Sequence, residues 1–221
     1  MKRLLAAIVK DDRKQVEALL KATPGLVKEL VPAPILYSSE ILHWIYQGDT
    51  ALHLAAAGHR VELVRLLIRA GADPNAASNH RRGSPLHYAA DGVLTHPGWT
   101  AARQVETIRE LLAHGGDLHL QDKNGATPLH RAVRTRCAAA VACLLAAGAN
   151  PLTPNLSGST PFHLAVQNTG RGGSGTSVAV SAQREIIQVF RSHGISPDLR
   201  IACGKSVRES ARSAWIQELL A

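Results

Sequence analysis

The feature that most constrains this chain is a seven-residue pattern that occurs four times at nearly even intervals. The copies are TALHLAA from Thr50, SPLHYAA from Ser84, TPLHRAV from Thr127 and TPFHLAV from Thr160, spaced by 34, 43 and 33 residues. Each copy precedes an apolar stretch with helical spacing that ends in glycine. A period of this length indicates stacked supersecondary units, because one such unit cannot bury its apolar face without a neighbour.

The unit that begins at Thr127 shows how the pattern would fold. Thr127 is a good N-cap residue and Pro128 suits the first helical position, so a short helix is expected here. A second helix with Val141 on its apolar face follows, and Gly148 closes it in the left-handed conformation. The chain must then reverse before Thr160, which predicts a hairpin-like loop.

The T-P-L-H-x-A motif, the 33-residue period and the closing G-A-D-P-N resemble the ankyrin repeat family. The resemblance implies an all-α, ankyrin-type solenoid of about six helix-turn-helix units with β-hairpin-like loops. Weaker copies at both ends extend it over nearly the whole chain. It predicts a single domain over residues 1–221, with units at approximately 1–30 (an N-terminal cap), 46–78, 79–121, 122–154, 155–200 and 201–221 (a C-terminal cap).

Three segments break the period. Residues 24–46 exceed a normal connection, and their aromatic part, 36–46, is expected either to shield the first unit or to form a dimer patch. Residues 93–103 and 170–182 each separate the two helices of one unit, so both should emerge on the edge opposite the hairpin-like loops. The second of these contains GRGGSGTS, which is typical of a flexible tether.

Histidine occupies the fourth position of every motif copy. The family resemblance implies that this imidazole hydrogen-bonds neighbouring backbone and the cap hydroxyl, and a catalytic group would not be needed four times. We therefore predict a structural role for all four and no catalytic, cofactor-binding or metal-binding residue. The four histidines are His53, His87, His130 and His163.

The composition indicates in which cellular compartment the chain is expected to fold. No apolar run approaches the roughly 20 residues of a membrane helix, and the apolar stretch 4–9 is shorter than a signal sequence needs. The three cysteines form no C-x-x-C and no disulfide framework, which favours a reducing, cytoplasmic setting. By alignment of the units, Cys143 should be buried and Cys137 exposed. The polar terminal units favour a monomer, because they oppose end-to-end stacking.

Charge is unevenly distributed along the sequence. The net charge is +8, and no Asp or Glu occurs between Lys123 and Arg184. The family resemblance implies that loop tips and exposed first-helix positions line a concave groove that contacts partners. The predicted partner-binding residues are His80, Arg81, Arg82, Asp91, Trp99, Lys123, Asn124, Arg131, Arg134, Thr135, Gln167 and Asn168.

The sequence supports three hypotheses about function. The first is a non-catalytic protein–protein interaction module whose basic concave groove binds an acidic partner, since an arginine fork pairs two carboxylate oxygens. The second is nucleic-acid binding through the same surface, although no interleaved aromatics, helix-turn-helix or basic arm accompany the charge. The third and least favoured is an enzyme that uses the inserted loops near Trp99 and Arg171.

Overall fold

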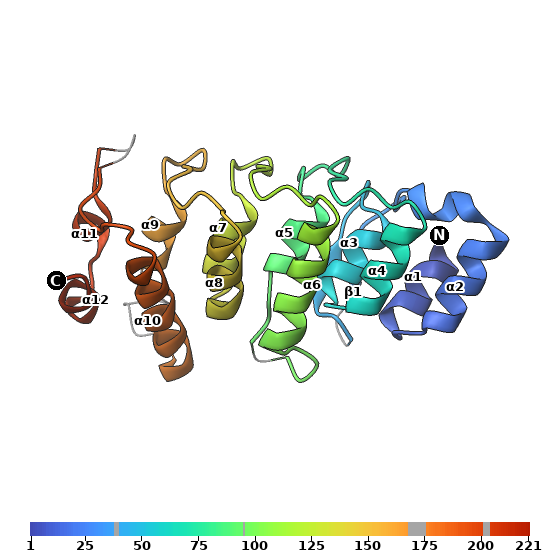
Figure 1. The fold of residues 1–221 in the computed structure, drawn as a ribbon, viewed down its shortest axis with the longest axis horizontal. Helices are drawn as coiled ribbons and strands as arrows, with labels where there is room; N and C mark the ends of the chain where they lie inside the picture. Colours follow the sequence, from blue (N-terminus) through green and yellow to red (C-terminus); the bar gives the residue numbers. More distant parts are fainter. Residues whose placement is uncertain (38–39, 95, 168–175, 201–203) are drawn as a thin grey trace.

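The computed structural model shows a row of helix pairs stacked side by side (Figure 1). It describes residues 1–37, 40–94, 96–167, 176–200 and 204–221. First helices pack on first helices and second helices on second helices along the whole row. The pairs are α1 (Lys2–Val9) with α2 (Arg13–Ala22), α3 (Ala51–Ala57) with α4 (Val61–Arg69), α5 (Pro85–Ala90) with α6 (Ala101–Ala113), α7 (Pro128–Arg134) with α8 (Ala138–Ala146), α9 (Pro161–Ala165) with α10 (Ser177–Ser192), and α11 (Val207–Ser210) with α12 (Ala214–Leu220). The predicted all-α solenoid is confirmed.

The motif histidines connect successive units. At the start of α7 the Thr127 side chain accepts from the backbone N–H of the third helical residue, and the Thr127 N–H donates to Nδ1 of His130 at 3.1 Å. Nδ1 is therefore an acceptor, so the proton of the neutral ring lies on Nε2, which donates to the carbonyl of Ser159 at 3.1 Å. The predicted structural role is confirmed at every copy. Nε2 of the other three histidines also donates to a backbone carbonyl of the following unit: His53 to Gly83, His87 to Ala126 and His163 to Lys205.

Small residues allow the two helices of a unit to approach closely. Ala55, Ala89 and Ala132 have no exposed surface, and they belong to the same buried cluster as leucines of the second helices. Gly148, with φ of +95°, follows α8 in the left-handed region that a side chain rarely adopts. The core is thus one continuous aliphatic layer along the row, with the stacked rings of Phe162 and Phe190 near its C-terminal end.

The loops that follow α4, α6 and α8 turn back as predicted, and none of their residues is assigned to a strand. The Asp122 N–H donates to the Ala126 carbonyl at 2.9 Å, which closes one loop on itself. The Lys123 N–H donates to the Arg81 carbonyl at 2.8 Å, so neighbouring loops are also joined. Figure 1 shows these loops along one long edge of the molecule.

The segment 24–46 contains the two strands found in the described residues. After the 3₁₀ turn η1 (Pro24–Lys28), β1 (Ile35–Tyr37) pairs antiparallel with β2 (His43–Ile45). Ile41 and Ile45 are buried, and β2 contacts α3. The hairpin therefore covers the first-helix side of the second unit. Shielding of the first unit and a dimer patch, the two expectations from the sequence, both stay predictions.

The 93–103 insertion joins α5 to α6 on the edge opposite the loops, as predicted (Figure 1). In uninterrupted units, the Arg60 N–H donates to the Ala55 carbonyl and the Cys137 N–H to the Ala132 carbonyl. In the unit carrying this insertion, the equivalent Ala89 carbonyl accepts from the side-chain amide of Gln104 at 3.1 Å. A side chain thus replaces a backbone donor that the insertion has displaced.

The same replacement occurs in the unit that contains the 170–182 insertion. There the Ala165 carbonyl accepts from the Gln183 amide at 2.7 Å, and the Gln167 carbonyl accepts from the same nitrogen at 2.9 Å. Residues 177–182 of the insertion form the first turns of α10. The rest of the expected tether, 170–175, lies outside the described residues, with Ser177 belonging to the helix.

The C-terminal pair closes the row. The Ser206 hydroxyl accepts from the Glu209 N–H, and the Glu209 carboxylate accepts from the Ser206 N–H at 2.8 Å. Ile216 and Leu220 of α12 are buried against α10. Among the helices in the described ranges, none combines the length and apolar character needed to cross a bilayer.

Replacement of Gln183 or Gln104 by Met should destabilise the protein. Each change keeps most of the side-chain volume but removes the amide that donates to two backbone carbonyls. Those carbonyls belong to Ala89 and Ala90 for Gln104, and to Ala165 and Gln167 for Gln183. Loss of these hydrogen bonds costs about 1–3 kcal/mol. Urea denaturation followed by circular dichroism measures the effect. Gln15→Met, at an exposed position of α2, is the matched control and should change stability by no more than about 0.5 kcal/mol. Equal losses in all three variants would contradict the proposed bonding role.

Two buried histidines should make the stability of the protein depend on pH. Burial lowers the pKa of His59 and of His87 to about 4, from 6.5 in an exposed chain. Their neutral rings therefore stabilise the fold above pH 6.5, and this contribution is lost as the pH falls towards 4, by about 3 kcal/mol for each ring. Denaturation at about pH 7.5 and about pH 4.5 measures the difference. His59→Asn keeps a donor at a positive-φ position and should reduce the dependence. His87 should retain its own contribution, and so should His53 and His130, whose pKa values burial also lowers. A stability that does not change over this interval would refute the assignment.

Candidate functional site

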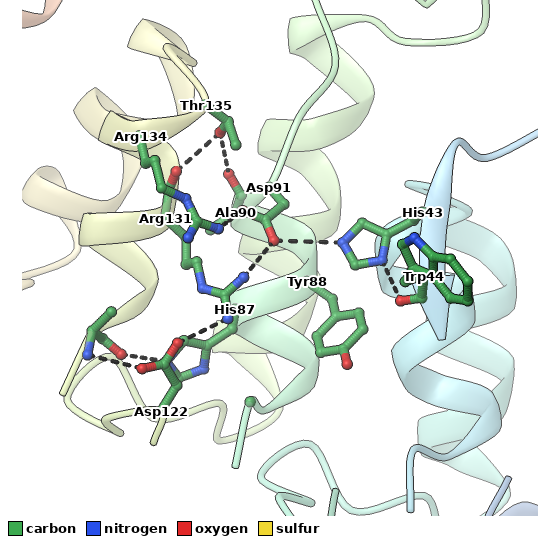
Figure 2. Close-up of polar contacts among 12 residues, drawn as sticks. His43, Trp44, His87, Tyr88, Ala90, Asp91, Asp122, Arg131, Arg134 and Thr135 are labelled. Carbon is green, nitrogen blue, oxygen red and sulfur yellow. Dashed lines mark hydrogen bonds and ion pairs between the residues drawn. The ribbon is translucent and has the colours of Figure 1, made fainter. Parts of the chain in front are cut away.

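The described part of the chain has a pocket of about 260 Å³ on the first-helix side of the row. The β1–β2 hairpin forms one wall and α7 forms the other, with the C-terminal end of α5 between them. Figure 2 shows His43 and Trp44 on the hairpin side, Asp91 in the middle, and Arg131, Arg134 and Thr135 on the α7 side. Trp99, from the 93–103 insertion, lines the pocket as well.

Aromatic contacts fix the hairpin wall. Trp44 stacks on Tyr46 with ring centroids 6.4 Å apart, and the guanidinium carbon of Arg81 lies 4.6 Å from the Tyr46 ring centroid. The Tyr46 N–H donates to the Asp49 carboxylate at 2.6 Å, and the Tyr88 hydroxyl donates to the same oxygen at 2.7 Å. The buried Asp49 carboxylate therefore holds the end of the hairpin against α5.

Arg131 is the centre of a buried ion-pair network (Figure 2). Its side chain is only 7% exposed, and its two terminal nitrogens donate to Asp91 at 3.0 Å and to Asp122 at 2.8 Å. Asp122 also accepts from the backbone N–H groups of Asn124 and Ala126. Because Asp91 belongs to the preceding unit, the network joins two units through charge as well as through apolar packing.

Asp91 is the carboxylate on which the pocket's basic side chains converge. Its Oδ2 lies 3.4 Å from Nε2 of His43 and its Oδ1 lies 3.6 Å from Arg134. Burial raises the pKa of Asp91, but the His43 hydrogen bond and the charge of Arg131 outweigh it and hold the pKa at about 2. The carboxylate is therefore ionised and already compensated at neutral pH.

Gly92 is required where the 93–103 insertion leaves α5. A Cβ there would lie 2.4 Å from the Cys137 sulfur and 2.8 Å from Nε1 of Trp99. Nε1 of Trp99 donates to Gln104 at 3.2 Å, which seats the indole beside the pocket. The loop can therefore approach α8 closely enough to cover the thiol.

The expectation that Cys137 is exposed is wrong, because Cys137 is 2% exposed. Alignment with Arg60 could not show that the insertion of the preceding unit folds over this position. Burial raises the pKa of the Cys137 thiol, so the thiol form is favoured at neutral pH. Cys143 is half-buried, as is the aligned Leu66, so the expected full burial is also wrong.

The structure divides the predicted partner-binding residues among several places. Arg81, Asp91, Trp99, Arg131, Arg134 and Thr135 line the pocket. The loop tips carry His80, Arg82, Lys123 and Asn124, which are all exposed. Gln167 lies beside Lys205 at a separate hollow near the C-terminal cap. Asn168, Arg171 and Cys203 lie outside the described residues.

The loop-tip cations differ from Arg131 in their pairing. No ion pair joins Arg81, Arg82 or Lys123 to any residue of the described ranges. The backbone hydrogen bond from Lys123 to Arg81 keeps their two loops together. Arg134 is 56% exposed, and its ion pair with Asp91 is longer than those of Arg131. Positive charge is thus accessible at the loops and along α7, whereas Arg131 is committed to internal carboxylates.

Sequence reasoning missed the contributions of His43, His59 and Asp122. The first comes from the 24–46 segment, whose path no repeat pattern specifies, although the aromatic residues around it were noticeable. His59 donates to the Ala89 carbonyl at 3.1 Å, and only its place just before α4 hints at this contact. Asp122 could have been suspected as the partner of a charged residue in a motif position that is otherwise apolar or aromatic.

Comparisons with known proteins agree with the architecture. Residues 47–79 match the family profile described as ankyrin repeat, and residues 99–201 match that described as ankyrin repeats (3 copies). The chain is 30% identical over 177 residues to the B-cell lymphoma 3 protein homolog of Mus musculus, covering 78% of this chain and 34% of that protein. It is 33% identical over 120 residues to transient receptor potential cation channel subfamily A member 1 of Homo sapiens, covering 53% and 10%.

A third relative is ankyrin repeat and SOCS box protein 16 of Homo sapiens, 30% identical over 140 residues, which cover 49% of this chain and 31% of that protein. The chain therefore spans between 10% and 34% of the length of these relatives.

Replacement of Arg131 by Met should be strongly destabilising. It leaves Asp91 and Asp122 buried without their shared cation, and breaking a buried pair in this way costs about 3–5 kcal/mol. Arg134→Met is the matched control, since it removes only the long, exposed contact to Asp91 and should cost no more than about 1 kcal/mol. Urea denaturation of both variants checks the difference, and similar losses would show that the buried network does not stabilise the fold.

Proposed function

This chain belongs to the ankyrin repeat family, and on that premise we propose that it is a non-catalytic module that binds a protein partner through an acidic segment. Ankyrin repeats are general protein-interaction modules. The observation that carries the proposal is the group of accessible cations Arg81, Arg82 and Lys123, which have no ion pair with any described residue.

The position of these cations favours a partner that runs along the loops and first helices. Arg134 extends the positive surface along α7, and Arg131 supports it from inside through Asp91 and Asp122. Exposed charges of this kind mainly set the rate of association and its dependence on salt, while packed side chains supply most of the affinity. Binding should therefore weaken as the salt concentration rises.

Replacement of Arg81, Arg82 and Lys123 by Glu should reduce recovery of the partner by about tenfold or more. Three attractions become repulsions, and a tenfold change needs only about 1.4 kcal/mol in total. Affinity capture from the native cell, with identification and quantification of the recovered proteins, measures the effect. No internal ion pair is broken, so the thermal stability of the variant should remain close to that of the wild type.

The control changes Arg13, Lys14 and Lys21 of α2 to Glu. These exposed residues lie in the N-terminal unit, and their replacement alters the net charge by the same amount. Undiminished recovery with the loop variant, or an equal loss with the control, would reject the loop surface as the binding site. Recovery that disappears after nuclease treatment would instead support the nucleic-acid alternative.

A further inference from the structure

The pocket beside the hairpin has a guanidinium that is held on an aromatic ring and has no acceptor among the residues that the structure describes. Arg81 lies on the Tyr46 ring, and its Nε is buried without a hydrogen-bond partner among the described residues. The two terminal nitrogens of Arg81 also have no acceptor among the described residues, and they remain accessible from the pocket. Because stacking on an aromatic ring restricts the side chain in advance, less freedom is lost when a carboxylate binds.

The charges around the pocket favour an anion over a cation. Arg81 and Arg134 supply the accessible positive charge of its lining, which also includes the carboxylates Asp91 and Glu40. Arg131 lines the pocket too, but it is already paired with Asp91 and Asp122. Asp91 already receives contacts from His43, Arg131 and Arg134, so little of its charge is left to attract a second cation. Arg134, which is mostly exposed, can turn towards a bound anion.

An apolar surface continues from the mouth of the pocket. Trp44 is 46% exposed, and Leu36, its directly paired residue on β1, is exposed to the same extent. Directly paired residues of antiparallel strands project from the same face of a hairpin. Trp44 also stacks on Tyr46, so the apolar surface is continuous with the ring that supports Arg81.

We propose that this pocket receives an acidic side chain of the partner, held by Arg81 and Arg134, while an adjacent large apolar side chain of the partner rests on Trp44 and Leu36. The pocket volume of 260 Å³ is below the roughly 300–1,000 Å³ of sites for drug-sized ligands, which suits one side chain rather than a cofactor. The inference rests on the proposed function and specifies its anchor, an acidic residue next to an apolar one.

The three tryptophans of the chain provide a local test by nuclear magnetic resonance. Trp44 and Trp99 line the pocket, whereas Trp215 lies in α12 at the C-terminal end of the row (Figure 1). The probe is the blocked peptide acetyl-Ser-Leu-Glu-Leu-Ser-amide, titrated into ¹⁵N-labelled protein up to about 10 mM, and its Glu→Gln counterpart is the matched probe. Trp→Phe variants assign the three indole N–H signals.

The acidic peptide should shift the Trp44 and Trp99 signals in a saturable way and leave the Trp215 signal in place. The Gln peptide should bind at least about tenfold more weakly, because it lacks the charge that strengthens bonds to a guanidinium. Arg81→Gln should weaken the acidic peptide by a similar factor, whereas Arg13→Gln, at an exposed site of α2, should not. Trp44→Ala should also weaken the peptide, with Trp99 as the remaining reporter.

Equal binding of the Glu and Gln peptides, or no shift of the Trp44 and Trp99 signals, would overturn the pocket assignment. The backbone amides of Arg82 and Lys123 separate this failure from that of the proposed function. If they shift while the pocket indoles do not, an acidic segment binds the loops and the proposed function stands without the anchor.

Discussion

A neutral imidazole that accepts at one nitrogen and donates at the other connects each of the four motif-bearing units to the unit that follows it. The acceptor side completes the cap of its own helix, and the donor side satisfies a carbonyl in the following loop. Desolvation favours the neutral ring, as the lowered pKa values of His53, His87 and His130 indicate. The connection between units therefore depends on the two different nitrogens of histidine, one of which accepts while the other donates.

The same need for donors explains how the row tolerates insertions. Where ten or more residues separate the helices of a unit, the backbone N–H that normally caps the first helix has moved away. Gln104 and Gln183 supply an amide at the corresponding place. With the stacking preserved, the 93–103 insertion is available to cover Cys137 and to place Trp99 beside the pocket. The side-chain amide of Gln104 thus allows the unit to carry an insertion that lines the pocket, which a regular repeat would not have.

Sequence patterns predicted the parts of the molecule that recur. The helix pairs, the role of the four histidines, the left-handed Gly148 and the edge on which residues 93–103 emerge all follow from spacing and cap chemistry. The burial of Cys137 did not, because it depends on contact with the preceding unit's insertion. The pairing of Arg131 with Asp91 and Asp122 was also missed, since a basic residue at a motif position does not reveal which way it points. The β1–β2 hairpin occurs once, and a feature without repetition offers no periodic signal.

The terminal unit changes the chemistry of this connection by a single residue. Glu209 occupies the place that histidine holds elsewhere, and its carboxylate still accepts from the Ser206 N–H. An ionised carboxylate has no proton to give, so the connection received from His163 through the Lys205 carbonyl is not passed on. The series of hydrogen bonds between units therefore stops at Glu209. A repeat grafted after this unit would require the substitution Glu209→His before it could be joined in the same way.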